Sequence, residues 1–433
     1  MANKKIGLLS VVSIGIGGMV GGGIFAVLGL SVQLAQGGAP IAFMIAGVVA
    51  LITAYAYAQL SVTFPSRGGT VTFLNKAFGK GLFTGGLNLL LLLSYVVMLS
   101  LYSSAFGSYG ATFFPENIRP IAEHFLISGI IIGITVINLM SADIIGSAES
   151  FIVGFKLIIL LVFIVLGFPN IEFSNLAPSN WSNPLMLVAG GMIIFLAYEG
   201  FELMANTAED VRDPERTLPR AYYTAVIFVI FLYVAIAAVT AGSLPVDQIV
   251  AAKDYALAAA AKPFMGNFGF ILITIAALLS TTSAINATAY GTARISYIIA
   301  RSGELPAALE KKIWNQPVEG LLITSALTLF VANLFDLSGI STMGSSGFLI
   351  IFAAVNLANA RLHRQTKSRQ WISLLGVIVC VAALVILLTQ TARQNPQNLL
   401  VVVVMVGLAF TIELIYRQFT NRQIHLHQTN KNS

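Results

Sequence analysis

No charged residue occurs between Ile6 and Ser66, and apolar stretches of comparable character recur along the rest of the chain. A soluble core has no need of apolar runs this long and this frequent, whereas a run of about 20 apolar residues can cross a lipid bilayer as a helix. Of the 433 residues, 57% are hydrophobic and only 10% are charged. We therefore expect an all-α integral membrane protein whose surroundings are a lipid bilayer.

The apolar runs predict twelve membrane spans separated by short polar connections. The spans cover residues 7–30, 40–64, 82–112, 125–141, 144–168, 185–208, 220–242, 266–300, 319–335, 338–361, 371–390 and 397–416. Residues 65–80 are expected to form a short amphipathic connection, and residues 244–263 an external loop with helical stretches.

Basic residues predict the orientation of these spans. Of the 24 Lys and Arg residues, the expected outer loops hold only Arg119, Lys253, Lys262 and Arg393. Nearly all the others fall on the opposite side, which the positive-inside rule assigns to the cytoplasm. We expect a multi-pass protein of the plasma membrane with both termini cytoplasmic, including a basic tail at 417–433. The net charge of +6 arises at span ends and does not indicate a nucleic-acid partner.

The first span contains an unusual density of glycine. Seven of the seventeen residues from Ser13 to Gly29 are Gly, including the triplet Gly21-Gly22-Gly23. Each Gly inside a helix costs roughly 0.5–1 kcal/mol relative to Ala. Two explanations are open: close helix packing through small residues, or a break in the helix that lines a binding site.

The sixth span also has a middle that is a poor membrane helix. Its sequence FLAYEGFE places Glu199, Gly200 and Glu202 at membrane depth, where each unpaired carboxylate costs about 2.5 kcal/mol or more. Spans one and six are five apart, so they cross the membrane in opposite directions. Two interrupted helices at corresponding positions of inverted halves are typical of the central site of a transporter. This second interruption favours a broken-helix site over simple packing.

Three motifs carry a resemblance: the first span ending in GGGIF, the sixth span FLAYEGFE followed by AEDVRDPERTLPRA, and the eighth span STTSAINATAYGTARISYIIARSGELP. Together they resemble the amino acid–polyamine–organocation transporter superfamily. The resemblance implies a five-plus-five inverted repeat with broken helices one and six. The first repeat would be residues 1–168 and the second 185–361, with two additional helices in 371–416.

The resemblance also implies where a substrate binds. Gly22 and Gly23 fall where family members offer backbone N–H groups to a substrate carboxylate, and Met19 lies on the preceding half-helix. The backbone carbonyls of Leu196, Ala197 and Glu199 would face the substrate ammonium. Leu196 stands where many members have an aromatic gate, which leaves three candidates for the occluding residue: Phe195, Tyr198 and Phe201.

Lys156 is a charged residue deep in the fifth span. It lies thirteen residues beyond Asp143, about 20 Å along a helix. One explanation is a structural ion pair. The other follows from the resemblance: in some proton-coupled members a similar lysine replaces the sodium ion between helices one and eight. Its expected partners are carbonyls near Gly17–Val20 and the hydroxyls of Thr282 and Ser283. Because burial disfavours the charged form, we expect Lys156 to gain and lose a proton during transport.

Glu199 and Glu202 are three residues apart, a spacing that brings side chains together on a helix, although Gly200 is expected to break that helix. Two adjacent carboxylates in a low-dielectric site do not easily both ionise. We expect one to be protonated, with Glu202 as a proton site beside Lys156 and Glu199 attracting an amine. The alternative is that one of them only hydrogen-bonds the broken helix ends.

The chain lacks the motifs of an ATPase, a metalloprotease or a nucleophilic enzyme, such as GxxxxGK[ST], HExxH or CxxC. We expect no cofactor, no metal and no catalytic residue. The predicted function is secondary transport of amino acids or related amines, driven by protons through alternating access. An exchanger or uniporter of the same fold remains open, an ion channel is a more distant alternative, and the oligomeric state is left open.

Overall fold

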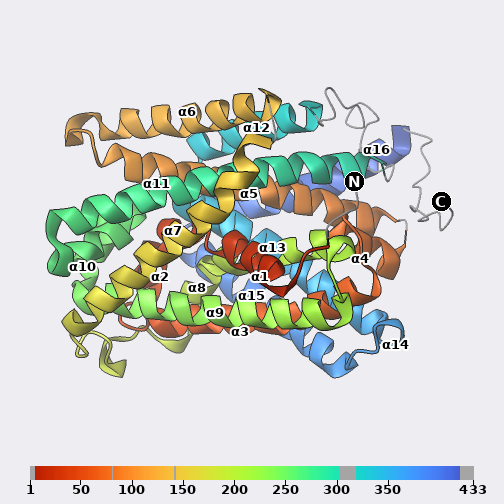
Figure 1. Cartoon of the computed structure of the whole chain (residues 1–433), viewed down its shortest axis with the longest axis horizontal. Helices are drawn as coiled ribbons and strands as arrows, with labels where there is room; N and C mark the ends of the chain where they lie inside the picture. Colours follow the sequence, from red (N-terminus) through yellow and green to blue (C-terminus); the bar gives the residue numbers. More distant parts are fainter. Residues whose placement is uncertain (1–4, 80, 141–142, 302–317, 420–433) are drawn as a thin grey trace.

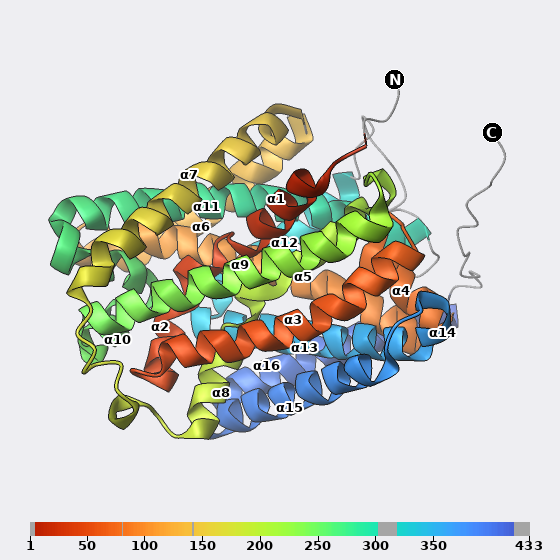
Figure 2. The same cartoon turned by 60° about the horizontal axis from the view of Figure 1, so that its bottom comes forward.

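The computed structural model describes residues 5–79, 81–140, 143–301 and 318–419, so most of the tail at 417–433 lies outside it. Within these ranges the chain is helical apart from short connections, and the long helices run side by side along one direction (Figures 1 and 2). Extended pairing is limited, in the described part, to two isolated bridges, Ile6 with Val211 and Gln36 with Trp181.

The helices follow one another along the chain. Their bounds are α1 Leu8–Met19, α2 Gly23–Ala35, α3 Ala39–Thr63, α4 Gly69–Phe78, α5 Leu82–Ala111, α6 Arg119–Met140, α7 Asp143–Gly167, α8 Pro184–Ile193, η4 Phe195–Asp210, α9 Pro214–Ser243, α10 Val246–Ala252, η5 Lys253–Tyr255, α11 Ala256–Arg301, α12 Val318–Leu334, α13 Leu337–Arg361, α14 His363–Thr366, α15 Gln370–Gln394 and α16 Pro396–Phe419.

The expected all-α membrane architecture is confirmed. Among the described residues, nine helices are long and apolar enough to cross a membrane, and two bent pairs bring the number to eleven. A further apolar helix, α12, is only 17 residues long and lies where the span 319–335 is predicted. The division into two inverted repeats stays a prediction.

Both bent pairs fall in the predicted broken spans. α1 and α2 meet at 49°, and α8 and η4 meet at 46°. The first break lies in the glycine triplet, as expected. The second was expected at Gly200, and this is wrong: the break lies at Ile194, and η4 runs without interruption through Gly200 to Asp210. Gly200 instead allows the backbone of η4 to contact the backbone of α1.

The helices differ in how deeply they are buried. The most apolar 18-residue window is 78% buried in α5 and 83% buried in α13, against 28% in α6 and α15 and 22% in α16. The first two helices therefore form the centre, and the last three present apolar side chains outward. α4 and α14 lie at one end of the molecule and α10 at the other (Figures 1 and 2).

The two expected connections are also partly helical. α4 occupies most of the amphipathic connection 65–80. The loop 244–263 contains α10, η5 and the first turns of α11, which then kinks at Gly266, where φ is +63°. The predicted span 266–300 begins at this kink.

Candidate functional site

The two broken spans touch backbone to backbone. A Cβ atom added to Gly200 in η4 would lie 2.2 Å from the carbonyl carbon of Gly18 and 2.4 Å from the amide nitrogen of Met19 in α1. A Cβ added to Gly18 would lie 2.8 Å from the Gly200 carbonyl oxygen. Only glycine allows this approach, and it places the two helix breaks close together.

Hydroxyl groups satisfy the carbonyls that the first break releases from helical bonding. Tyr233 of α9 donates to the Met19 carbonyl at 2.6 Å. Ser280 of α11 donates to the Gly21 carbonyl at 2.8 Å. Without water at this depth, released backbone groups need protein partners, and these two side chains provide them. Neither residue was identified from the sequence.

The second break is stabilised in the same way. Ser345 of α13 donates to the Ile193 carbonyl at 3.2 Å and accepts from the Leu196 amide at 3.2 Å, and Ser341 also donates to Ile193. The Tyr233 hydroxyl lies 3.3 Å from the Ala197 carbonyl, which is one of the carbonyls expected to face an ammonium. This hydroxyl therefore lies between the two breaks.

The predicted N–H donors of the first break are closely covered. A Cβ at Gly22 would lie 2.5 Å from the Tyr102 ring of α5, and one at Gly23 would lie 2.9 Å from the Ala197 side chain. The glycines thus provide both the break and the close packing that the sequence offered as alternatives. The first N–H groups of α2, like those of any helix, have no acceptor within the helix.

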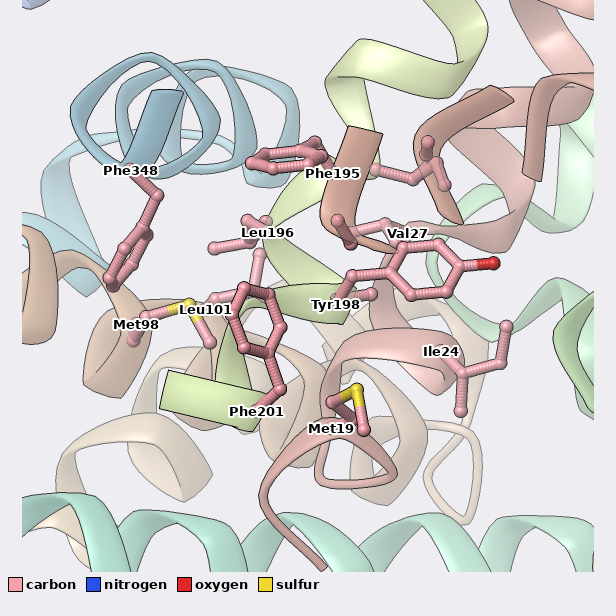
Figure 3. Packing of buried hydrophobic residues seen from close by; sticks show 14 of the residues in the cluster. Met19, Ile24, Val27, Met98, Leu101, Phe195, Leu196, Tyr198, Phe201 and Phe348 are labelled. Atoms are coloured by element: carbon pink, nitrogen blue, oxygen red, sulfur yellow. The ribbon is translucent and has the colours of Figure 1, made fainter. Parts of the chain in front are cut away.

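The other residues predicted to contact substrate are packed together in the protein interior. Figure 3 shows Met19, Phe195, Leu196, Tyr198 and Phe201 in one cluster between the broken helices, α5 and α13. Each has a solvent-exposed fraction of 1% or less. The three aromatic candidates for an occluding residue are therefore fully buried in this conformation.

A cavity of about 590 Å³ adjoins this cluster on the side of the first turns of α1. Residues of α1, α5, α7, η4 and α11 form its wall. It extends from Leu9, which is 80% exposed, to Glu199, which is 4% exposed. Of the predicted substrate residues in the described chain, only Glu199 lines it.

Glu199 and Glu202 have different surroundings although both are buried. The Glu202 carboxylate accepts hydrogen bonds from Tyr57 at 2.9 Å, from Thr70 at 2.8 Å and from Tyr95. These hydroxyls come from α3, α4 and α5, and they suit an ionised carboxylate, which only accepts. The Oε2 atom of Glu199, in contrast, has no hydrogen-bond partner among the described residues.

Lys156 of α7 reaches the first broken helix. Its side chain is 1% exposed, and its Nζ atom lies 3.4 Å from the carbonyl oxygen of Gly17. This is one of the expected carbonyl partners. The Thr282 hydroxyl donates to the Leu278 carbonyl of its own helix at 2.7 Å, and Ser283 lines the cavity. The hydroxyl of α11 that contacts the break is that of Ser280, two residues before Thr282.

Three tyrosines on one face of α5 contact the broken helices, and sequence reasoning missed all three. Tyr95 donates to Glu202, Tyr102 covers Gly22, and Tyr109 donates to the Phe25 carbonyl at 3.0 Å. Their spacing of seven residues, two helical turns, could have identified them. An aromatic ring with a polar tip at this interval in an apolar helix suggests a row of hydrogen-bonding positions.

Backbone hydrogen bonds and ion pairs connect segments at the end of the molecule near the chain start. The Ile6 amide donates to the Asp210 carbonyl and the Arg212 amide to the Ile6 carbonyl, both at 2.8 Å. Arg67 pairs with Glu209 at 3.7 Å and with Asp210 at 3.2 Å. α1 and η4 are therefore joined here as well as at Gly18 and Gly200.

Acidic residues gather at the opposite end, where Asp254 of η5 lies near Glu123 of α6 and near Asp336, which precedes α13. Burial raises the pKa of Asp254 in η5 to about 6, with nearby Glu123 and Asp336 acting in the same direction and Lys253 opposing them. The Oδ1 atom of Asp254 has no hydrogen-bond partner in the described chain. Its surroundings thus make ionisation of this carboxyl energetically unfavourable.

No group of His, Cys, Asp and Glu among the described residues has the geometry of a metal site.

The chain resembles known proteins over most of its length. A family model described as amino acid permease matches residues 6–410. The chain is 35% identical to an uncharacterised protein of Methanocaldococcus jannaschii, over 98% of this chain and 97% of that protein.

Two further relatives have names that describe transport. The inner membrane transport protein YbaT of Escherichia coli is 32% identical over 96% of this chain and 97% of its own length. The branched-chain amino acid permease BcaP of Bacillus subtilis is 23% identical over 84% of this chain and 81% of its own length. The chain is therefore a multi-pass membrane protein that belongs to the amino acid permease family, a family of transporters.

Proposed function

We propose that this permease is a proton-coupled symporter that moves amino acids across the plasma membrane by alternating access. Membership of the amino acid permease family supports the substrate class. The two helix breaks, brought together at Gly18 and Gly200, support a central site, because helix ends supply N–H groups for a carboxylate and carbonyls for an ammonium.

The substrate carboxylate binds at Gly22 and Gly23, and the ammonium binds at the carbonyls of Leu196, Ala197 and Glu199. Tyr233 is the switch between empty and loaded forms, since its hydroxyl lies near the Ala197 carbonyl that the ammonium needs. The packed aromatic residues around the breaks separate to admit the substrate.

In this proposal both termini lie in the cytoplasm. Their position decides to which side of the membrane the cavity opens. The cavity lies beside the first turns of α1, so it faces the cytoplasm. The conformation is thus the inward-facing one, with the substrate site closed.

The observation that carries the coupling is the contact between Lys156 and Gly17. A protonated Lys156 donates to the Gly17 carbonyl and holds α1 against α7. Loss of the proton removes this charge-assisted bond and lets α1 move away. Protonation of one buried lysine therefore changes the position of the helix that carries the substrate N–H groups. Glu202 provides a second proton site, and Ser283 adds a hydroxyl to the cavity wall.

The test uses the full-length protein in proteoliposomes with a mixture of labelled amino acids. Lys156→Ala should abolish accumulation driven by a pH gradient but retain counterflow exchange, which needs no gradient. Lys76→Ala, which removes an exposed lysine from α4, is the matched control and should leave both activities unchanged. Gradient-driven uptake by Lys156→Ala equal to that of the parent would disprove the coupling role.

A further inference from the structure

Among the described residues, Glu199 is the one predicted substrate contact that lines the cavity. It is 4% exposed, and its Oε2 atom has no hydrogen-bond partner in the described part of the chain. A buried carboxylate without a partner is costly at membrane depth. A cationic group that enters the cavity removes this cost.

The titratable groups that interact electrostatically with Glu199 are Glu202, Tyr95 and Tyr102. Glu202 lies one turn along η4, and its carboxyl group accepts hydrogen bonds from three hydroxyls. Tyr95 and Tyr102 line the same cavity and are close enough to interact with Glu199 electrostatically. Two acidic groups and two aromatic rings together favour a cation over a neutral or anionic ligand.

Two residues of the cavity wall also contact the first helix break. Tyr102 and Ala284 line the cavity, and both lie 3.3 Å from the position of a Cβ atom at Gly21, next to the proposed carboxylate site. A ligand whose carboxylate binds at Gly22 and Gly23 can therefore direct its side chain toward Glu199. A volume of about 590 Å³ holds an amino acid with a long side chain.

We propose that Glu199 is a specificity-determining residue that binds a second amino or guanidinium group on the substrate side chain. The permease then selects cationic amino acids over neutral ones of the same shape. This inference rests on the proposed amino acid transport, but it concerns the side chain of Glu199, whereas the transport proposal uses its backbone carbonyl.

The experiment compares lysine with norleucine, which has the same carbon chain and lacks the terminal amine. Binding of both is measured on the full-length protein in nanodiscs. The parent should bind lysine about thirtyfold more tightly than norleucine. Removal of one partner of a buried charge pair weakens binding by about this factor. Glu199→Gln should bring the ratio close to one while norleucine binding stays the same. Glu199→Asp, which keeps the charge, should retain a preference for lysine.

Glu413→Gln is the matched control, because Glu413 is also buried but lies in α16, pairs with Arg417 and does not line the cavity. It should leave the ratio unchanged. Equal affinities of the parent for lysine and norleucine would overturn the inference and leave amino acid transport standing, and this measurement needs no variant. An equal loss of both ligands in Glu199→Gln would overturn it too. Failure of the parent to bind or transport any amino acid would instead refute the proposed function.

Discussion

The crossing of Gly18 and Gly200 gives a sharp prediction about stability. In Gly200→Ala, the new Cβ atom would lie 2.2 Å from the Gly18 carbonyl carbon and 2.4 Å from the Met19 amide nitrogen, where ordinary contacts begin at 3.4 Å. The two backbones must separate by about 1 Å, because neither contact belongs to a side chain that can rotate. Overpacking that side chains absorb costs about 1–3 kcal/mol, so we expect at least about 3 kcal/mol here.

The matched control is Gly133→Ala in α6. A Cβ atom at Gly133 would have no neighbour within 4 Å, so the change adds only helix propensity and should stabilise by up to about 1 kcal/mol. Both variants are purified in detergent, and the apparent melting temperature is measured. Gly200→Ala should melt several degrees below the parent, and Gly133→Ala at or above it. A Gly200→Ala protein with the melting temperature and uptake of the parent would refute the backbone contact.

Three further changes test the surroundings of the site. Tyr233→Phe removes the hydroxyl shared by Met19 and Ala197 and should destabilise by about 1–3 kcal/mol; thermal unfolding at the parental midpoint would contradict this. Glu202→Gln cannot accept from all three hydroxyls and should change the pH profile of uptake; an unchanged profile would leave Glu202 a structural role only. Asp254 has a folded-state pKa of about 6, above its usual 3.8, so its contribution to stability is present in acid and is lost as the pH rises through 6. Asp254→Asn should therefore stabilise the protein by about 3 kcal/mol at pH 8, with a higher melting temperature, and should have little effect at pH 4. A shift in melting temperature of equal size at both pH values would contradict the burial argument.

The all-α membrane architecture, both interrupted helices and the buried charges could be predicted from the sequence, because each depends on local composition. Lys156 could be assigned to carbonyls of the first span because a lone ammonium in an apolar helix needs an acceptor, and Gly17 lies at that position. The break at Ile194 was assigned wrongly to Gly200. A glycine indicates close backbone approach as readily as a break, and only the neighbouring helix decides between the two.

Other parts of the site depend on contacts between distant segments. Ser280, rather than Thr282, contacts the first break, because the rotation of α11 about its axis decides which hydroxyl faces inward. The different surroundings of Glu199 and Glu202 arise from three separate helices that supply hydroxyls to one carboxylate only. Neither the rotation of a helix nor its neighbours can be read from one chain.

The row of tyrosines on α5 has a mechanical consequence. Tyr95 and Tyr109 lie fourteen residues apart, about 21 Å along a straight helix, with Tyr102 halfway between them. If the joined pair of broken helices tilts about the level of Tyr102, the contact of Tyr95 with Glu202 and the contact of Tyr109 with Phe25 must change in opposite senses. α5 thus provides three fixed positions against which a tilt of the broken helices can be measured. Fluorine-labelled tyrosines at these three depths would report the direction of the tilt, its pivot and its amplitude in one spectrum.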